Sequence, residues 1–269
     1  MSQAMNTGGE ASSGNLFQAE DISVRFGGIR AVDSVSFDVQ PGEVFSIIGP
    51  NGAGKTTIFN LISRIYNSTS GRLMFGGRDI TRIAPHRIAG LGIARTFQNI
   101  ELFANATLLQ NLLIGRHCHS RVGILSQMAF LPSSRREELH HREKVEDVIA
   151  FLDLQRYRDT LIANLPYGVR KVVELGRALC TEPKLLLLDE PSSGLNVEET
   201  EGMGFWIEDI KKDLGITVIM VEHDMALVSQ VSDRVMALNY GKVLAMGAPK
   251  EVQTHPEVVR AYIGGEDEE

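Results

Sequence analysis

Nine consecutive residues, from Gly49 to Thr57, have the types and spacing that bind phosphate groups. They fit the pattern G-x-x-x-x-G-K-[ST], whose glycines let backbone N–H groups converge on phosphate oxygens while the next helix adds its free donors. Lys55 would neutralise the β- and γ-phosphates of a nucleotide such as ATP, and the Thr56 hydroxyl would ligate Mg²⁺. The predicted phosphate loop comprises Gly49, Pro50, Asn51, Gly52, Ala53, Gly54, Lys55, Thr56 and Thr57. A glycine-rich turn without a ligand is the alternative, but an apolar run precedes the loop and a helical pattern follows it, as a phosphate site requires.

Polar side chains also follow three other predicted strands, at the ends where function gathers in an open parallel sheet. Asp189 is placed to hold Mg²⁺, and Glu190 beside it would orient or deprotonate the attacking water. His223 would donate a hydrogen bond to the γ-phosphate, and Gln98 would touch the metal and the water. Each has a plainer reading alone: an acid pair caps a helix, a Gln lies on the surface and a lone His is structural. Together with the phosphate loop, they predict a site that hydrolyses ATP.

A second anion-binding site is predicted in the segment Leu165-Pro166-Tyr167-Gly168-Val169, just before a predicted helix. Backbone donors and the helix N-terminus would bind the anion there, with Leu165, Tyr167 and Gly168 as nucleotide contacts. A chain with one phosphate loop and one such segment permits a head-to-tail pair that shares two ATP molecules across its interface. The alternative is an ordinary Pro-Gly helix start, which spacing alone does not exclude.

The elements that must position these residues alternate between strands and helices. Apolar and polar residues alternate from Ile22 to Val39 around a Gly-Gly turn, which predicts antiparallel strands with one wet face. Continuous apolar runs at 44–48, 185–188 and 216–221 are separated by helical patterns. Such strands predict a parallel sheet covered on both faces, and hence an α/β fold.

Two predicted helices carry capping boxes at their starts, one formed by Ser134 with Glu137 and one by Asn196 with Glu199. The pattern between 115 and 133 is weak. Histidines around Cys118 and at 140–141 suggest zinc ligands, but a solvated helix surface is the favoured explanation.

Composition restricts the partners and the compartment. The net charge of −7 argues against a nucleic-acid partner, because phosphate backbones are bound through Lys and Arg. Two cysteines without framework spacing fit a reducing cytosol, and no apolar stretch approaches the roughly 20 residues that cross a bilayer. Residues 1–15 are predicted to be a flexible leader, 16–265 a single domain and 266–269 an acidic tail.

From about Phe17 to Gly265 the sequence resembles the ATP-binding subunits of ABC transporters. Six family motifs occur in order: Walker A (GPNGAGKTT), the Q-loop (RTFQ), the signature (LPYGV), Walker B (LLLLDEP), the D-loop (SSGLN) and the H-loop (VEHDM). The resemblance implies a P-loop NTPase fold with a parallel core sheet, an antiparallel β subdomain and a helical subdomain at about 99–165. It also implies that Phe26 stacks on adenine and that Gln98 couples bound ATP to a groove for a permease helix.

Within the family the sequence is most similar to LivG-type subunits of branched-chain (hydrophobic) amino acid importers, through stretches such as RFGGIRAV, EHDMALV and HPEVVRAYIGG. This likeness implies an ATPase that powers uptake through a separate permease, with a solute-binding protein acting indirectly. It would lie at the cytoplasmic face of the inner membrane, as a homodimer or heterodimer. Urea and amide importers share most of these stretches, so the solute stays open.

The signature departs from the usual family pattern at two positions. Pro166 replaces the usual Ser and Val169 the usual Gln, and proline supplies neither a hydroxyl nor an N–H. We therefore expect weaker ATP-driven closure from this half-site, with a partner subunit supplying a fuller signature.

Two other functions compete with transport. A soluble ABC ATPase of assembly, DNA repair or translation usually has coiled-coil insertions or tandem modules, and neither is evident here. A catalytically silent nucleotide-gated regulator is disfavoured by Glu190 and His223.

Overall fold

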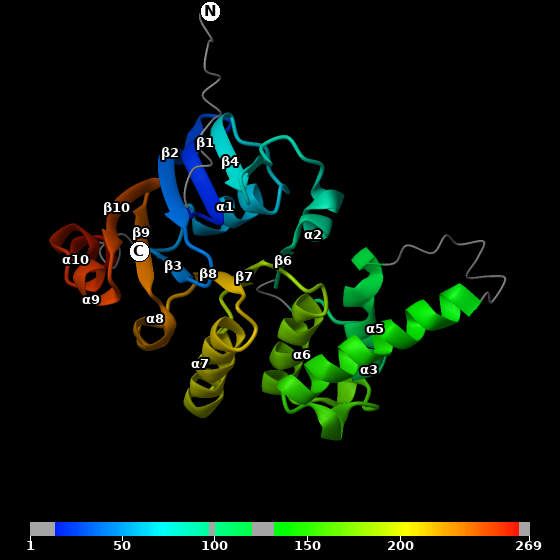
Figure 1. The fold of residues 1–269 in the computed structure, drawn as a ribbon. Helices are drawn as coiled ribbons and strands as arrows, with labels where there is room; N and C mark the ends of the chain where they lie inside the picture. Colours follow the sequence, from blue (N-terminus) through cyan, green and yellow to red (C-terminus); the bar gives the residue numbers. More distant parts are fainter. Residues whose placement is uncertain (1–13, 97–99, 120–131, 264–269) are drawn as a thin grey trace, which may run out of the picture.

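The computed structural model describes residues 14–96, 100–119 and 132–263, with side chains in all of these except 132–134 and 263. They form a four-stranded antiparallel sheet and a six-stranded sheet (Figure 1). The antiparallel sheet has the order β2-β1-β4-β5. Its strands are β1 (Phe17–Phe26), β2 (Ile29–Val39), β4 (Ser70–Phe75) and β5 (Arg78–Asp79). β1 and β2 pair as the predicted hairpin, with Phe26 opposite Ile29.

The six-stranded sheet has the order β10-β9-β3-β8-β7-β6. Its strands are β3 (Val44–Ile48), β6 (Ile93–Arg95), β7 (Leu185–Asp189), β8 (Thr217–Val221), β9 (Arg234–Asn239) and β10 (Lys242–Gly247). Neighbours from β6 to β9 are parallel, and β10 pairs antiparallel with β9. The predicted parallel core sheet is therefore confirmed, with one antiparallel strand at its edge.

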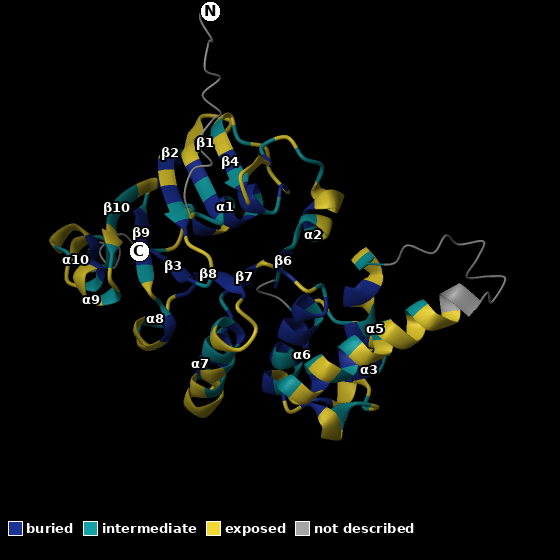
Figure 2. Cartoon of the chain, in the orientation of Figure 1, coloured by how far each residue is buried: buried dark blue, intermediate teal, exposed yellow. Residues whose placement is uncertain are grey.

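Successive residues of the central strands pack alternately into two separate hydrophobic cores. In β3, Phe45 and Ile47 pack into the core that includes the antiparallel sheet and α1, whereas Val44 and Ile48 pack into the core on the opposite face. Every residue of β3, β7 and β8 is buried, as the dark strands in Figure 2 show. The apolar runs are thus continuous because both faces of the sheet are covered.

Helices cover both faces of the six-stranded sheet, and most of them follow β6 in the chain. They are α1 (Lys55–Ile62), α2 (Ile88–Leu91), α3 (Leu108–Gly115), α5 (Pro132–Phe151), α6 (Tyr167–Leu179), α7 (Val197–Lys212), α8 (Met225–Val231), α9 (Pro249–Gln253) and α10 (Pro256–Ile263). Short 3₁₀ turns are η1 (Pro85–Arg87), η2 (Arg116–His119), η3 (Gln155–Tyr157) and η4 (Ile162–Asn164). The capping box of Asn196 with Glu199 is confirmed at the start of α7. The predicted cap at Ser134 is wrong: α5 begins at Pro132, a residue type that suits the first helical position, so Ser134 lies inside the helix.

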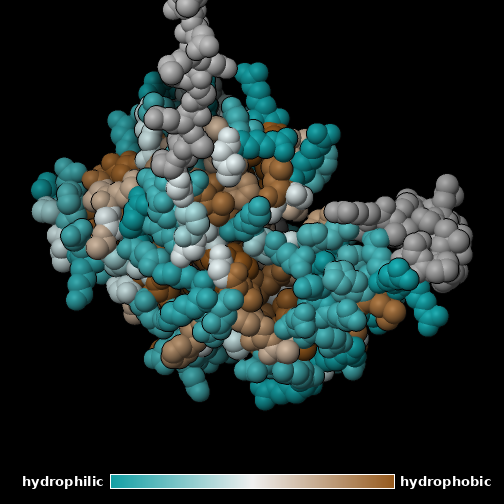
Figure 3. All heavy atoms as spheres, in the orientation of Figure 1, coloured by the Kyte–Doolittle hydropathy of each residue, from teal (hydrophilic) through white to brown (hydrophobic). Residues whose placement is uncertain are grey.

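The predicted helical subdomain contains α3, α5 and the turns η2 to η4 among its described residues. Its status as a separate unit stays a prediction. The acidic tail, most of the leader and most of the segment 115–133 lie outside the described residues. No helix within the described ranges has the length and apolar character to span a bilayer. Hydrophilic residues cover much of the face in Figure 3, and hydrophobic groups show between them, near its middle and at its upper left.

Candidate functional site

The phosphate loop lies between β3 and α1, as predicted, and crowded backbone makes two of its glycines necessary. A Cβ atom at Gly49 would lie 2.2 Å from the carbonyl oxygen of Leu238, and one at Gly54 would lie 2.5 Å from that of Ala31. Gly54 is also the N-cap of α1, with a φ of 105° that other residues rarely adopt. The loop is therefore held between β9 and β2 by packing that excludes side chains.

Lys55 is the buried cation of this loop. Its ammonium donates hydrogen bonds to the carbonyl oxygens of Gly49 (2.6 Å) and Pro50 (2.9 Å). Burial lowers the pKa of Lys55, and the negative charges of Glu190 and Asp189 oppose that shift. The two carboxylates predicted from a different strand thus lie close enough to Lys55 to influence its charge.

The remaining loop residues differ in their exposure. Ala53 is buried, Pro50, Gly54 and Thr57 are partly buried, and Asn51, Gly52 and Thr56 are exposed. The exposed Thr56 stands at the second position of α1, directly after Lys55. Thr56 is therefore accessible to a ligand at the N-terminus of this helix.

Asp189 and Glu190 mark the end of β7, which is separated from β3 in the sheet only by β8. Asp189 is 4% exposed and accepts a hydrogen bond from the Arg95 guanidinium, with 2.7 Å between Nη2 and Oδ2. Glu190 adopts a φ of 49°, and its N–H donates to the carbonyl oxygen of Val221. The left-handed backbone at Glu190 turns the chain sharply away from the strand.

His223 follows β8 and lies beside Glu190. Its Nε2 is 2.5 Å from Oε1 of Glu190, and the His side chain is 43% exposed whereas the Glu side chain is 14% exposed. The structure therefore brings together two residues that the sequence predicted separately, from the ends of neighbouring strands.

Glu222 connects these strand ends and was missed as a site residue by the sequence interpretation. The buried carboxylate accepts from the N–H of Ser192 (2.7 Å) on one oxygen and from the N–H groups of His223 (2.8 Å) and Asp224 (3.2 Å) on the other. Its position directly before His223, at the end of an apolar strand, was the available signal. Glu222 thereby fixes the loops that follow β7 and β8.

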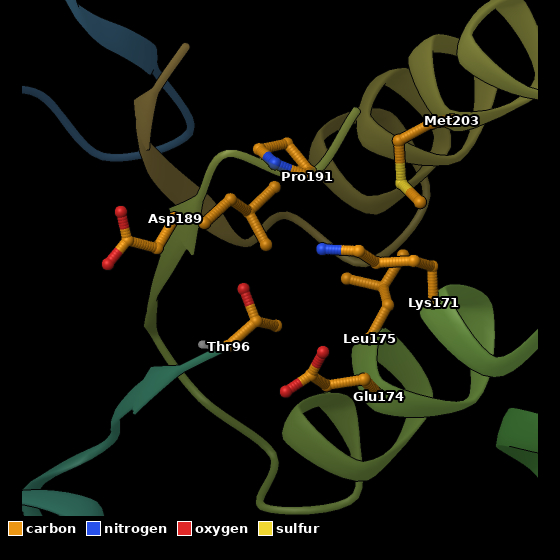
Figure 4. Close-up of a pocket in the computed structure, with 8 residues that line it drawn as sticks. Thr96, Lys171, Glu174, Leu175, Asp189, Pro191 and Met203 are labelled. Carbon is orange, nitrogen blue, oxygen red and sulfur yellow. The ribbon is translucent and has the colours of Figure 1, made fainter. Parts of the chain in front are cut away.

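Lys171, on α6, was also missed, and it lies near the carboxylates. It lines a small cavity of about 10 Å³ together with Glu174 and Asp189 (Figure 4). Burial lowers the pKa of Lys171, while the charges of Glu174, Glu222, Glu190 and Asp189 oppose the shift. A second buried cation therefore balances this group of acids.

The signature segment packs against the loop that follows β7 in the same chain. Tyr167 donates a hydrogen bond to the carbonyl oxygen of Ser193 at 3.2 Å. A Cβ atom at Gly168 would lie 2.2 Å from Oε1 of Glu199, so Gly168 has a packing role of its own. Leu165 is buried in the core, which leaves only its backbone for a ligand.

For two predicted site residues, Phe26 and Gln98, the contact with the ligand stays a prediction. Phe26 is 45% exposed and meets Tyr66 edge-on, with 5.0 Å between ring centroids. Its ring is accessible, and its contact with adenine stays a prediction. Gln98 lies outside the described residues. The strand β6 leads towards it, and the N–H of Thr96, directly after β6, donates to the carbonyl oxygen of Leu187 in β7.

The predicted metal ligands beyond Gln98 have the chemistry that Mg²⁺ prefers. Thr56 offers a hydroxyl and Asp189 a carboxylate, both hard oxygen donors. Groups of three or more His, Cys, Asp or Glu placed around one metal position are absent from the described residues. His119 and His141, from the histidine cluster, instead contact Thr181 and Arg116.

Comparisons with known proteins agree with this geometry. Residues 32–193 match the family described as ABC transporter, and residues 242–268 match the family described as branched-chain amino acid ATP-binding cassette transporter. The chain is 36% identical to the high-affinity branched-chain amino acid transport ATP-binding protein BraF of Pseudomonas aeruginosa, and 35% identical to LivG of Escherichia coli K12. Each match covers 93% of this chain and 98% of the relative.

Solved structures show the same likeness in three dimensions. The ADP conformation of an ATP-binding cassette of an ABC transporter superposes with a TM-score of 0.82 at 34% identity, over 94% of this chain and 100% of that one. A nucleotide-free cassette gives a TM-score of 0.81 at 33% identity, over 93% and 99%. The predicted P-loop ABC ATPase fold is confirmed, and the chain belongs to the ABC transporter family of ATP-binding proteins.

Proposed function

We propose that this chain hydrolyses ATP to drive the import of branched-chain or other hydrophobic amino acids through a separate membrane permease. The observation that carries the proposal is the extent of the likeness: 35–36% identity to BraF and LivG over 98% of their lengths. The C-terminal residues 242–268, which match a family named for branched-chain amino acid transport, support the same solute class.

The phosphate loop and Lys55 would hold the triphosphate. Loop N–H groups and the N-terminus of α1 offer donors, and the Lys55 ammonium would exchange its carbonyl partners for the β- and γ-phosphates. Phe26 would stack on the adenine. In a second chain, the backbone at Leu165, Tyr167 and Gly168 would meet the same nucleotide from the other side of the interface.

Thr56 and Asp189 would hold Mg²⁺, together with Gln98. When bound, the ion would neutralise negative charge on the phosphate oxygens and so assist attack by water on the γ-phosphorus, with ADP as the leaving group. These residues supply hard oxygen atoms from two elements, the start of α1 and the end of β7.

Glu190 would act as the general base that takes a proton from the attacking water. His223, 2.5 Å away, would orient the Glu190 carboxylate and reach the γ-phosphate from the end of β8. Glu222 holds the backbone on both sides of this pair, at Ser192 and at His223. The buried Glu222 carboxylate therefore stabilises the two loops that carry Glu190 and His223.

As in its family, the chain would work as a dimer at the membrane surface. A head-to-tail pair would place each signature segment over the partner's phosphate loop, and closure around ATP would move the permease. The subunit would lie at the cytoplasmic face of the inner membrane, held there by the permease, with a solute-binding protein acting from outside.

A transport assay with Glu190→Gln tests this function. We expect the complex of chain, permease and solute-binding protein, in proteoliposomes, to take up radiolabelled leucine only with Mg-ATP. Glu190→Gln should lower ATP hydrolysis and uptake by about 10² to 10⁴-fold, the usual contribution of a general base, while ATP still binds. Uptake of urea in place of leucine would contradict the solute class, and an unchanged hydrolysis rate would remove Glu190 from the base role.

A further inference from the structure

Arg95 makes the closest ionic contact to the predicted metal site, yet none of the roles assigned above includes it. We propose that Arg95 is a positioning residue that holds the Asp189 carboxylate in the orientation required by the metal ion of Mg-ATP. The inference rests on the proposed function, because it assigns Asp189 to the metal.

The contact between the two side chains is short and shielded from water. Nη2 of Arg95 lies 2.7 Å from Oδ2 of Asp189, and the side chains are 8% and 4% exposed. The two residues end neighbouring parallel strands, β6 and β7, so the sheet itself brings them together. Solvent and salt screen such a buried pair only weakly.

The other arm of the guanidinium reaches the helix that follows the phosphate loop. Nη1 of Arg95 donates to Oδ1 of Asn60 (2.7 Å) and to Oγ of Ser63 (3.0 Å). The guanidinium carbon also lies 5.5 Å from the ring centroid of Phe59. Asn60 and Phe59 belong to α1, and Ser63 is the C-cap of that helix.

Arg95 therefore connects the two elements that carry the predicted metal ligands. Thr56 stands near the start of α1 and Asp189 at the end of β7, and the planar fork of one guanidinium bonds to both elements at once. A lysine at this position would keep the charge but could not reproduce the two-armed bridge. The arginine thus sets the position of Asp189 relative to the helix that presents Lys55 and Thr56.

The ion pair uses Oδ2 of Asp189, so we assign Oδ1 to the metal side. Partners that hold a ligand in place typically contribute 10- to 100-fold to metal affinity. Two other roles for Arg95 predict different results. If the guanidinium only competed with the metal for the carboxylate, its removal would raise the metal affinity. If the ion pair were purely structural, its removal would leave the metal affinity unchanged.

Metal binding to the full-length chain separates these roles. The chain, in excess over a non-hydrolysable ATP analogue, is titrated with Mn²⁺ as a substitute for Mg²⁺, and bound Mn²⁺ is followed by electron paramagnetic resonance. For Arg95→Gln we expect the free Mn²⁺ concentration at half-saturation to rise about tenfold. Arg95→Lys should show a smaller rise, and it serves as the test variant if Arg95→Gln does not fold.

Two controls make the outcome specific. The affinity of the analogue in EDTA should stay within about twofold of the wild type, because Arg95 acts on the metal ligand and not on the phosphate loop. Arg234→Gln removes a similar arginine, whose guanidinium carbon lies 5.3 Å from the ring centroid of Phe45 and which pairs with Glu43. This variant should leave the Mn²⁺ titration curve unchanged.

An unchanged or lower half-saturation concentration in Arg95→Gln, or in Arg95→Lys where that variant is used, would overturn the inference. Failure of the wild type to bind the analogue at all would instead overturn the proposed nucleotide site.

Discussion

Glu222 stabilises the loops around the predicted catalytic pair through three backbone hydrogen bonds. Its carboxylate accepts from Ser192 after β7 and from His223 and Asp224 after β8, at distances between 2.7 and 3.2 Å. A carboxylate has only acceptor atoms, which suits a position surrounded by N–H groups. Charge-assisted bonds of this kind are roughly twice as strong as neutral ones. Glu222 therefore helps to fix the relative position of Glu190 and His223, in addition to their direct contact.

The substitution Glu222→Gln tests that dependence. The amide keeps one acceptor oxygen but turns an NH₂ group towards backbone donors, which should lower the free energy of unfolding by roughly 1–3 kcal/mol. Urea denaturation gives this value, and the ATPase rate should fall while the affinity for ATP is retained. Glu208→Gln is the control, because Glu208 pairs with Lys212 on the surface of α7, where such pairs contribute about 0.3–0.5 kcal/mol. Equal stability of the two variants would contradict the supporting role of Glu222.

A site residue was predictable from the sequence where its neighbours in the chain form a recognisable motif or strand. Lys55 belongs to a contiguous motif, and Asp189 follows an apolar strand, so each carries its signal in its neighbours. Arg95 begins the RTFQ segment, but nothing beside it indicates its partner, and the same holds for the contact of Lys171 with the carboxylates. The role of Arg95 comes from Asp189, 94 residues further along the chain, and it emerges only when the order of the strands is known.

At the scale of elements, the start of α6 contacts the loop after β7 through Tyr167, which bonds to Ser193 and lies against Gly194. Gly194 has a φ of 78°, and a Cβ atom there would lie 2.9 Å from the Tyr167 ring. Gly194→Ala should therefore destabilise the fold by roughly 1–2 kcal/mol from backbone strain alone, with the ring contact adding to it. Gly202→Ala provides the opposite control: this glycine lies in α7 with open space around it, and alanine should stabilise the helix by about 0.5–1 kcal/mol.

Urea denaturation of both glycine variants distinguishes the two effects. In a Tyr167→Ala background, the cost of Gly194→Ala should decrease, since the ring no longer opposes the added methyl group. A cost that is the same in both backgrounds would show that backbone strain acts alone and that the ring contact contributes nothing.

The elements themselves were predictable to the extent that their patterns are local. The apolar runs of β3, β7 and β8 and the cap at Asn196 each lie within a few residues, and the structure has them where predicted. The cap at Ser134 was wrong because Pro132 already provides a helix start two residues earlier. Strand order could not be predicted in the same way, because it depends on how helices pack across both faces of the sheet.

At the scale of the whole molecule, the signature segment has to serve a second chain. Pro166 is the N-cap of α6 and makes no side-chain capping bond. Serine at this position should stabilise the helix by about 1 kcal/mol and would add a hydroxyl on the surface expected to face the partner's nucleotide. We therefore expect Pro166→Ser to raise ATP hydrolysis by the homodimer roughly fivefold, the equivalent of about 1 kcal/mol for one added hydrogen bond.

The measurement is the ATPase rate as a function of protein concentration, because a rate limited by dimer closure rises faster than linearly. Pro249→Ser, at the start of the short helix α9, is the matched control and should leave the rate unchanged. The expectation follows from the departure at Pro166, which leaves the contact across the interface to backbone donors near Gly168. If the wild-type homodimer hydrolyses ATP as fast as a heterodimer with a subunit that has the usual signature, then Pro166 imposes no deficit and the weaker closure of this half-site is refuted.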